Sequence, residues 1–126
     1  MSRAPGLPLP VEGPRFRLEP VGGDGTRVSV LRRSDGRPVG RIAIEPLAGT
    51  LTVASLCIDE AYRSYGAGSE AGRLLVQGSE AAGFQTLRAW APADRGLAVY
   101  FWFRLGLHPI HGEGPDGGLW LERTLA

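Results

Sequence analysis

The alternation of apolar and polar residues predicts β-strands in the first half of the chain. Residues 16–19 alternate as a half-buried strand does, and residues 28–31 and 39–44 also have the composition of strands. The Ser-Asp-Gly-Arg sequence at 34–37 provides turn-forming residues between the last two, which favours a hairpin. A more continuous apolar run at 51–58 predicts a central strand. We therefore expect this half to form an antiparallel meander.

The second half predicts a helix, a strand, a short helix and a final hairpin. Small and apolar residues at helical spacing predict a helix over 69–82, which Gly83 ends in the left-handed conformation that glycine adopts easily. Residues 85–91 predict a strand, and residues 97–105 predict a short helix that ends at Gly106. A C-terminal hairpin is expected to follow. Together the two halves predict an α+β fold with two main helices.

Length and composition limit the possible functions. The chain has 126 residues, 43% of them hydrophobic, which is enough for one domain over 15–126 after a proline-rich extended arm at 1–14. A formal net charge of +1 argues against nucleic acid as a partner. No apolar run is long enough to cross a membrane, and no apolar signal core opens the chain, so we expect a cytoplasmic protein. The single cysteine excludes a disulfide framework and a multi-cysteine metal site, and we expect no metal.

The second expected helix is apolar on all sides. Its sequence at 97–103 is Leu-Ala-Val-Tyr-Phe-Trp-Phe, and a helix of this kind is normally buried all round. One face can pack on the sheet, whereas the face with Tyr100 and Phe103 needs a separate cover. Either the C-terminal hairpin, with Trp120, or a second copy of the chain in a homodimer could provide it, and the sequence leaves both open.

The strongest chemical signal is Arg-Ser-Tyr-Gly-Ala-Gly at 63–68, between the central strand and the first helix. Unpaired N–H groups and the helix dipole make a helix N-terminus suited to phosphate, and glycine lets the backbone approach a ligand closely. Gly66, Gly68 and Ala71 also fit a dinucleotide-binding pattern. Against that pattern, seven residues separate the strand from the first glycine, and no acidic residue ends the next strand. Two interpretations of the segment 63–68 therefore remain: an anion-binding site, and a plain loop that caps the helix.

The whole segment 56–68 resembles the strand–loop–helix step of the GNAT N-acyltransferase superfamily, in which Arg-x-x-Gly-x-Gly binds the pyrophosphate of acyl-CoA. Within this segment the Tyr62-Arg63 pair before the loop is usual in the family, and matches elsewhere in the chain are Gly83, Ala98, Phe101 and Leu105-Gly106-Leu107. The resemblance covers about residues 51–125. It implies a mixed, mostly antiparallel sheet in which the strands 51–58 and 85–91 diverge and leave a cleft.

The resemblance implies acetyl-CoA as a cosubstrate bound at this cleft. The pantetheine arm would pair with the backbone near residues 56–58, and the pyrophosphate would lie on N–H groups of residues 64–69, with Arg63 adding charge. The residues expected to bind the cosubstrate are Leu56, Cys57, Ile58, Arg63, Ser64, Tyr65, Gly66, Ala67, Gly68, Ser69, Arg95, Phe101 and Trp102.

The implied reaction is direct transfer of the acetyl group to an amine on a small molecule or a peptide. The chain departs from the family where this chemistry is performed, because Trp102 replaces a tyrosine acid, Arg95 an asparagine and Thr52 a glutamate base. Glu45 and Tyr100 are the remaining catalytic candidates. The sequence favours a solvated surface charge over a base for Glu45, and Tyr100 lies about 200° round the helix from Trp102.

A second departure concerns the acceptor site. The family usually inserts two helices between its first two strands, where this chain has only residues 20–27. The amine-binding wall is therefore either missing or supplied from elsewhere, and a second subunit is one candidate. Three functional hypotheses follow: an N-acetyltransferase, a non-catalytic acyl-CoA-binding sensor or subunit, and an interaction domain without a ligand.

Overall fold

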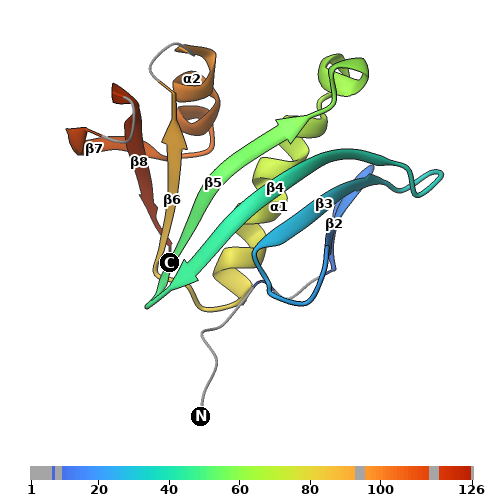
Figure 1. Cartoon of the computed structure of the whole chain (residues 1–126), viewed down its shortest axis with the longest axis horizontal. Helices are drawn as coiled ribbons and strands as arrows, with labels where there is room; N and C mark the ends of the chain where they lie inside the picture. Colours follow the sequence, from blue (N-terminus) through green and yellow to red (C-terminus); the bar gives the residue numbers. More distant parts are fainter. Residues whose placement is uncertain (1–6, 8–9, 93–95, 114–116, 126) are drawn as a thin grey trace.

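The computed structural model describes residues 7, 10–92, 96–113 and 117–125. Eight strands among them form one sheet in the order β1-β2-β3-β4-β5-β6-β8-β7 (Figure 1). The elements in chain order are β1 (Val11–Glu12), β2 (Phe16–Pro20), β3 (Arg27–Arg32), β4 (Pro38–Leu47), β5 (Thr50–Ile58), the 3-10 helix η1 (Glu60–Tyr65), α1 (Ala67–Ala81), β6 (Thr86–Ala91), α2 (Gly96–Arg104), β7 (His108–Glu113) and β8 (Leu119–Thr124). All strand pairs are antiparallel except β5–β6, which is parallel. The expected α+β fold is confirmed, with its meander, mixed sheet, two main helices and C-terminal hairpin. No helix in the described ranges is long and apolar enough to cross a bilayer.

The start of the sheet and the start of α1 differ from those expected. Residues 11 and 12 lie in the segment expected to be an extended arm, but they form β1, in which Val11 pairs with Leu18. Val11 is buried, and a Cβ placed on Gly78 of α1 would lie 3.1 Å from its Cγ2. Apolar burial therefore holds this edge strand. The helix α1 begins at Ala67, two residues early, because Gly66 has a φ of +76° and turns the chain directly from η1 into α1.

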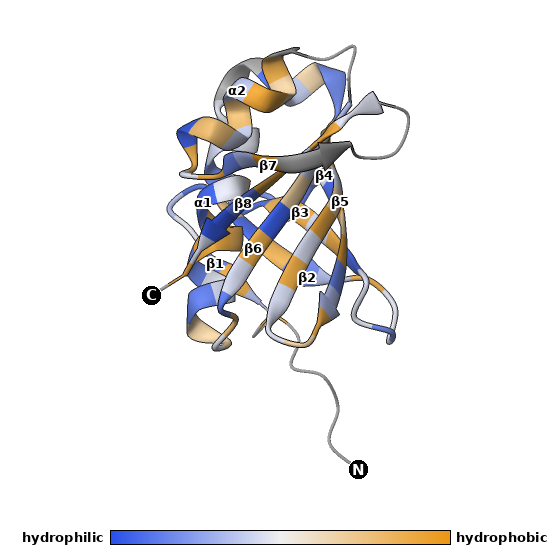
Figure 2. Ribbon diagram, turned by 90° about the vertical axis from the view of Figure 1, so that its left-hand side faces the viewer, coloured by the Kyte–Doolittle hydropathy of each residue, from blue (hydrophilic) through white to orange (hydrophobic). Residues whose placement is uncertain are grey.

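The hydrophobic core lies between α1 and one face of the sheet. Each strand of the meander buries alternate residues, so its apolar and polar colours alternate in Figure 2. The largest fully buried side chains include Leu18, Val30, Ile42, Leu51, Leu75 and Leu87.

The second helix, α2, packs closely on α1 at Gly72. A Cβ at this position would collide with Leu105 and would lie 3.2 Å from Phe101 Cζ. Glycine inside a helix costs about 1 kcal/mol relative to alanine. The close approach of the two helices is the reason for the glycine, a point that the sequence left undecided.

The outer face of α2 is apolar and exposed (Figure 2). Tyr100 is 59% exposed and Phe103 is 52% exposed, although Phe103 packs edge-on against His108 of β7 with ring centroids 5.2 Å apart. The described residues of the C-terminal hairpin therefore leave most of this face uncovered, which argues against one of the two covers considered for it.

A β-bulge reverses the facing of β5 halfway along the strand. Ile44 pairs with Val53 and Ala43 with Ser55, so Ala54 is the extra residue. Val53 is buried before the bulge and Ile58 after it, whereas Cys57 is exposed on the opposite face. Strict alternation from Val53 would have buried Cys57, whereas the bulge turns Ile58 towards the core instead.

Candidate active site

The strands β5 and β6 separate in the middle of the sheet. Their paired residues run from Thr50 and Thr86 to Val53 and Ala89. Residues 54–58 continue β5 beyond that point, with β4 as their paired neighbour. Backbone groups on the other side of this segment are positioned to bond an extended ligand. The residues expected to pair with such a ligand, 56–58, all lie here, so the expected splay of the central strands is confirmed.

The end of β5, the start of α1 and the middle of α2 converge at Gly68. A Cβ on Gly68 would lie 3.6 Å from Ile58 Cγ1 and 3.9 Å from Phe101 Cε2. Trp102 is only 4% exposed and packs edge-on against Phe101, with ring centroids 4.9 Å apart. Three of the expected binding residues, Ile58, Gly68 and Phe101, therefore meet at the point where β5 and β6 have separated, and Trp102 is buried in the core beside Phe101.

The N-terminus of α1 has the geometry of an anion site. The first helical bond is from the Glu70 N–H to the Gly66 carbonyl, at 3.0 Å, so the N–H groups of residues 67–69 have no acceptor within the helix. No side chain caps this end, and the helix has 15 residues. Its dipole and the N–H groups of this first turn therefore favour a phosphate near Gly66, Ala67, Gly68 and Ser69. The side chains of Ser64 and Tyr65, and the whole of Arg95, lie outside the described residues.

Two arginines flank this helix end. Arg63 is exposed, and its Nε donates to the Ile58 carbonyl at 2.9 Å, which ties η1 to the end of β5. Arg15 lies on the other side, where its Nη2 is 2.8 Å from a Cβ placed on Gly66. The sequence drew attention to Arg63 through the motif, but Arg15 comes from a distant segment and was missed.

A buried carboxylate, Glu70, was also missed. It is 2% exposed and accepts the backbone N–H groups of Arg15 at 2.9 Å and Phe16 at 2.7 Å. The Arg15 Nε lies 3.3 Å from its other oxygen. An acidic residue in the first turn of a helix was the available signal. These bonds hold the start of β2 against the N-terminus of α1.

The catalytic candidates lie in two different places. Glu45 pairs with Thr52, and Thr52 pairs with Arg88, so all three point to the face of the sheet opposite α1. Glu45 is exposed and stands beside the position where a glutamate base was expected. Tyr100 lies on the outer face of α2, with the Arg104 guanidinium 5.8 Å from its ring centre, and points away from Phe101 as its helical spacing predicts.

No protein-family model matches the sequence, and no curated protein matches it significantly. Solved structures do match. A protein described as a ribosomal-protein-serine acetyltransferase from Vibrio cholerae superposes with a TM-score of 0.76 at 13% identity, over 94% of this chain and 99% of its own. A GCN5-related N-acetyltransferase from Brucella melitensis has a TM-score of 0.72 at 15% identity, over 95% and 82%. PaiA N-acetyltransferase from Thermoplasma acidophilum, solved with coenzyme A, has a TM-score of 0.65 at 12% identity, over 78% and 59%. At these identities the likeness establishes a shared fold.

Proposed function

We propose that this chain, which has the fold of the GCN5-related N-acetyltransferases, binds acetyl-CoA and transfers its acetyl group to an amine. One observation carries the proposal. The α1 N-terminus, which has no side-chain cap, lies directly beside the end of β5, where β5 no longer pairs with β6. A diphosphate on the helix end and an amide-bearing arm along the strand would satisfy both sets of free backbone groups. Ile58, Gly68 and Phe101 would form the wall between them.

The residues of the cleft suit this cosubstrate. The N–H groups of residues 67–69 would hold the diphosphate, and Gly68 leaves room for close approach. Arg63 would add charge from the surface. The backbone of residues 56–58 would pair with the pantetheine arm, and the N–H of Ile58 would stabilise negative charge on the thioester oxygen.

We expect the acceptor amine to reach the thioester from the exposed face of the sheet. Glu45 stands there beside Thr52, just before the point where β5 and β6 separate. Its carboxylate would accept a proton from the amine, directly or through water, as the amine nitrogen attacks the thioester carbonyl. The carbon–sulfur bond then breaks, and the thiolate takes a proton from water. Trp102 is buried with an indole that is a poor acid, and Tyr100 faces away, so neither is assigned this role.

A second candidate function rests on the same cleft. The chain would bind acyl-CoA without turnover, as a sensor or subunit, because Thr52 and Trp102 replace the expected base and acid. The short connection between β2 and β3, residues 21–26, also lacks the helices that usually form an acceptor wall. Both candidates require cosubstrate binding, and only the first requires an amine product.

Calorimetry with acetyl-CoA tests the binding site. Gly66→Val should weaken binding at least tenfold, about 1.4 kcal/mol, because it disturbs a left-handed position and displaces Arg15 from the helix end. Gly83→Val is the matched control, since Gly83 has a φ of +87° at the opposite end of α1 with no atom near its Cβ. Equal affinity in both folded variants contradicts the site. Release of free thiol with a panel of amines and peptides then separates transferase from sensor.

A further inference from the structure

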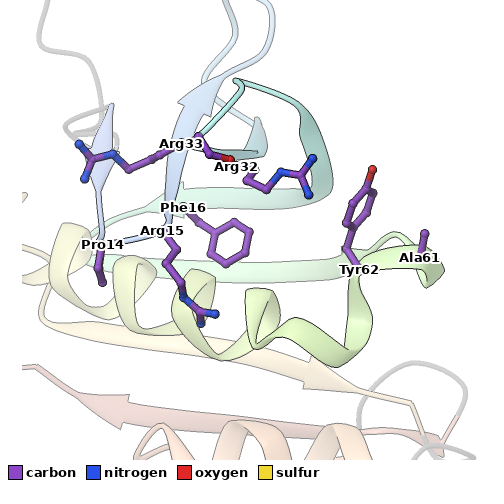
Figure 3. Close-up of a pocket in the computed structure, with 8 residues that line it drawn as sticks. Pro14, Arg15, Phe16, Arg32, Arg33, Ala61 and Tyr62 are labelled. Atoms are coloured by element: carbon purple, nitrogen blue, oxygen red, sulfur yellow. The ribbon is translucent and has the colours of Figure 1, made fainter.

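A large hollow lies on the β2 side of η1, away from the cleft between β5 and β6. It has a volume of about 670 Å³, and Arg15, Phe16, Arg32, Arg33 and Tyr62 are among the residues that line it (Figure 3). None of its lining residues belongs to β5, β6 or α2. The volume lies within the range of roughly 300–1,000 Å³ typical of small-molecule sites.

Arginines dominate the charged part of the lining. Arg15, Arg32 and Arg33 are among the lining residues, and no acidic residue is among those described. Their acidic partners lie outside the lining: Asp35 binds Arg32 at 2.6 Å, Glu70 lies 3.3 Å from Arg15, and Glu12 lies 3.9 Å from Arg33. Figure 3 shows the Arg32 guanidinium directed towards Tyr62, whereas the Arg33 guanidinium points away from that ring. An anion in the hollow would therefore meet Arg32 beside Tyr62 and Arg15 beside Phe16. Guanidinium groups present planar pairs of donors that match carboxylate and phosphate.

Two aromatic rings complete the lining. Figure 3 shows the Phe16 ring between the Arg15 and Arg32 side chains, with Tyr62 across the hollow. The Arg32 guanidinium lies 5.3 Å from the centre of the Tyr62 ring, and that of Arg15 lies 5.4 Å from the centre of the Phe16 ring. Ring faces and guanidinium planes both stack on flat ligands. The combination selects a ligand that has a planar ring as well as a negative charge.

The walls are held in place by bonds within the protein. Glu70 holds the backbone of Arg15 and Phe16, and the Arg33 N–H donates to the Arg15 carbonyl at 2.9 Å. The Arg33 Nη1 donates to the Gly13 carbonyl at 2.8 Å. The hollow is thus formed before any ligand arrives, which lowers the entropy cost of binding.

From this lining we infer that the hollow is a second binding site, separate from the acyl-CoA cleft, for a phosphate or carboxylate group attached to a planar ring. This inference does not depend on the proposed function. Its occupant would touch Arg15 and η1, which also border the N-terminus of α1. The two sites therefore share a wall but not a cavity.

Calorimetry with phenyl phosphate, inorganic phosphate and phenol tests the site. Phenyl phosphate should bind at least tenfold more tightly than either fragment, and it should still bind when acetyl-CoA is saturating. Arg32→Ala should weaken it at least tenfold. Arg37→Ala removes the same charge from the same hairpin but is not in the lining, so it should change the affinity less than twofold.

Three results would overturn the inference: no binding of phenyl phosphate at millimolar concentration, equal affinity in Arg32→Ala and wild type, or complete displacement by acetyl-CoA. The last would place the probe on the α1 N-terminus. If Arg32→Ala fails to fold, Arg32→Lys keeps the charge without the planar pair of donors and should still weaken phenyl phosphate. Acetyl-CoA affinity is measured separately in each variant, so failure of this site and failure of the proposed function give different results.

Discussion

The carboxylate of Glu70 lies 2.7 Å from the backbone nitrogen of Phe16, although 54 residues separate the two in sequence. The same oxygen accepts the Arg15 N–H, and a Cβ on Gly13 would lie 2.7 Å from it. One buried side chain thus joins the first turn of α1 to the start of β2. Both sites described above border this junction.

Glu70→Gln should destabilise the fold by roughly 1.5–3 kcal/mol, because the amide loses the negative charge and turns donors towards backbone N–H groups. Chemical denaturation of the variant measures this change. Glu80→Gln is the matched control on the same helix, where an exposed side chain 3.9 Å from Arg123 contributes within about 0.5 kcal/mol. Equal stability of the two variants would show that Glu70 does not hold the junction.

The features that were predicted correctly from the sequence are those that depend on residues close together in the chain. Alternation gave the strands of the meander because each of them buries one face, and the glycine spacing at 66 and 68 located the helix end. The bulge at Ala54 could not be predicted, since the apolar run at 51–58 gives no sign of an extra residue. Glu70 and Arg15 were missed for another reason: their role depends on β2 beginning beside α1, which is a tertiary contact between distant segments.

Gly40→Ala should destabilise the protein by roughly 1–3 kcal/mol. A Cβ on Gly40 would lie 2.7 Å from the Cys57 carbonyl oxygen and 3.3 Å from Ile58 Cα, and backbone atoms cannot move aside as a side chain can. Because the affected residues form the wall of the cleft, acetyl-CoA affinity should fall as well. Thermal unfolding and calorimetry measure the two effects. Gly23→Ala, with no atom within 4 Å of the new methyl group, should change neither.

The stability contributed by Asp35 should depend on pH. Hydrogen bonds from Arg32 and from the Arg37 N–H lower the pKa of Asp35 from 3.8 to about 2. A lowered pKa means that the carboxylate stabilises the folded chain above pH 3.8, and that this contribution is lost as the pH falls through about 2. The difference in Tm between wild type and Asp35→Asn should therefore be small and positive at neutral pH and should vanish near pH 2. A difference that grows on acidification contradicts the ion pair.

If the chain is a transferase, Glu45→Gln should lower kcat by roughly 10²–10⁴-fold with acetyl-CoA affinity unchanged, because general bases contribute about that much. Tyr100→Phe removes only a hydroxyl on the outer face of α2 and should lower kcat less than about tenfold. Steady-state thiol release measures both. A large loss in Tyr100→Phe together with normal turnover in Glu45→Gln would reverse the assignment.

The exposed apolar face of α2 predicts a homodimer. Leu97, Tyr100 and Phe103 are 84%, 59% and 52% exposed and lie along one side of the helix. Sedimentation at micromolar concentration should show a species heavier than the 13.4 kDa chain, and Phe103→Glu should return it to a monomer. Leu47→Glu, at a position 73% exposed at the end of β4, is the control. A monomeric wild type at that concentration contradicts the dimer.

The separation of β5 from β6 places an edge strand inside the sheet. Over residues 50–53 β5 is a central strand with neighbours on both sides, and over 55–58 β4 is its only partner among the described strands. Edges elsewhere in proteins recruit further strands, including those of other molecules, and so promote aggregation. A bound arm along residues 56–58 would act as the missing neighbour. The same backbone that would recognise a ligand thus makes the unliganded protein open to self-association at high concentration.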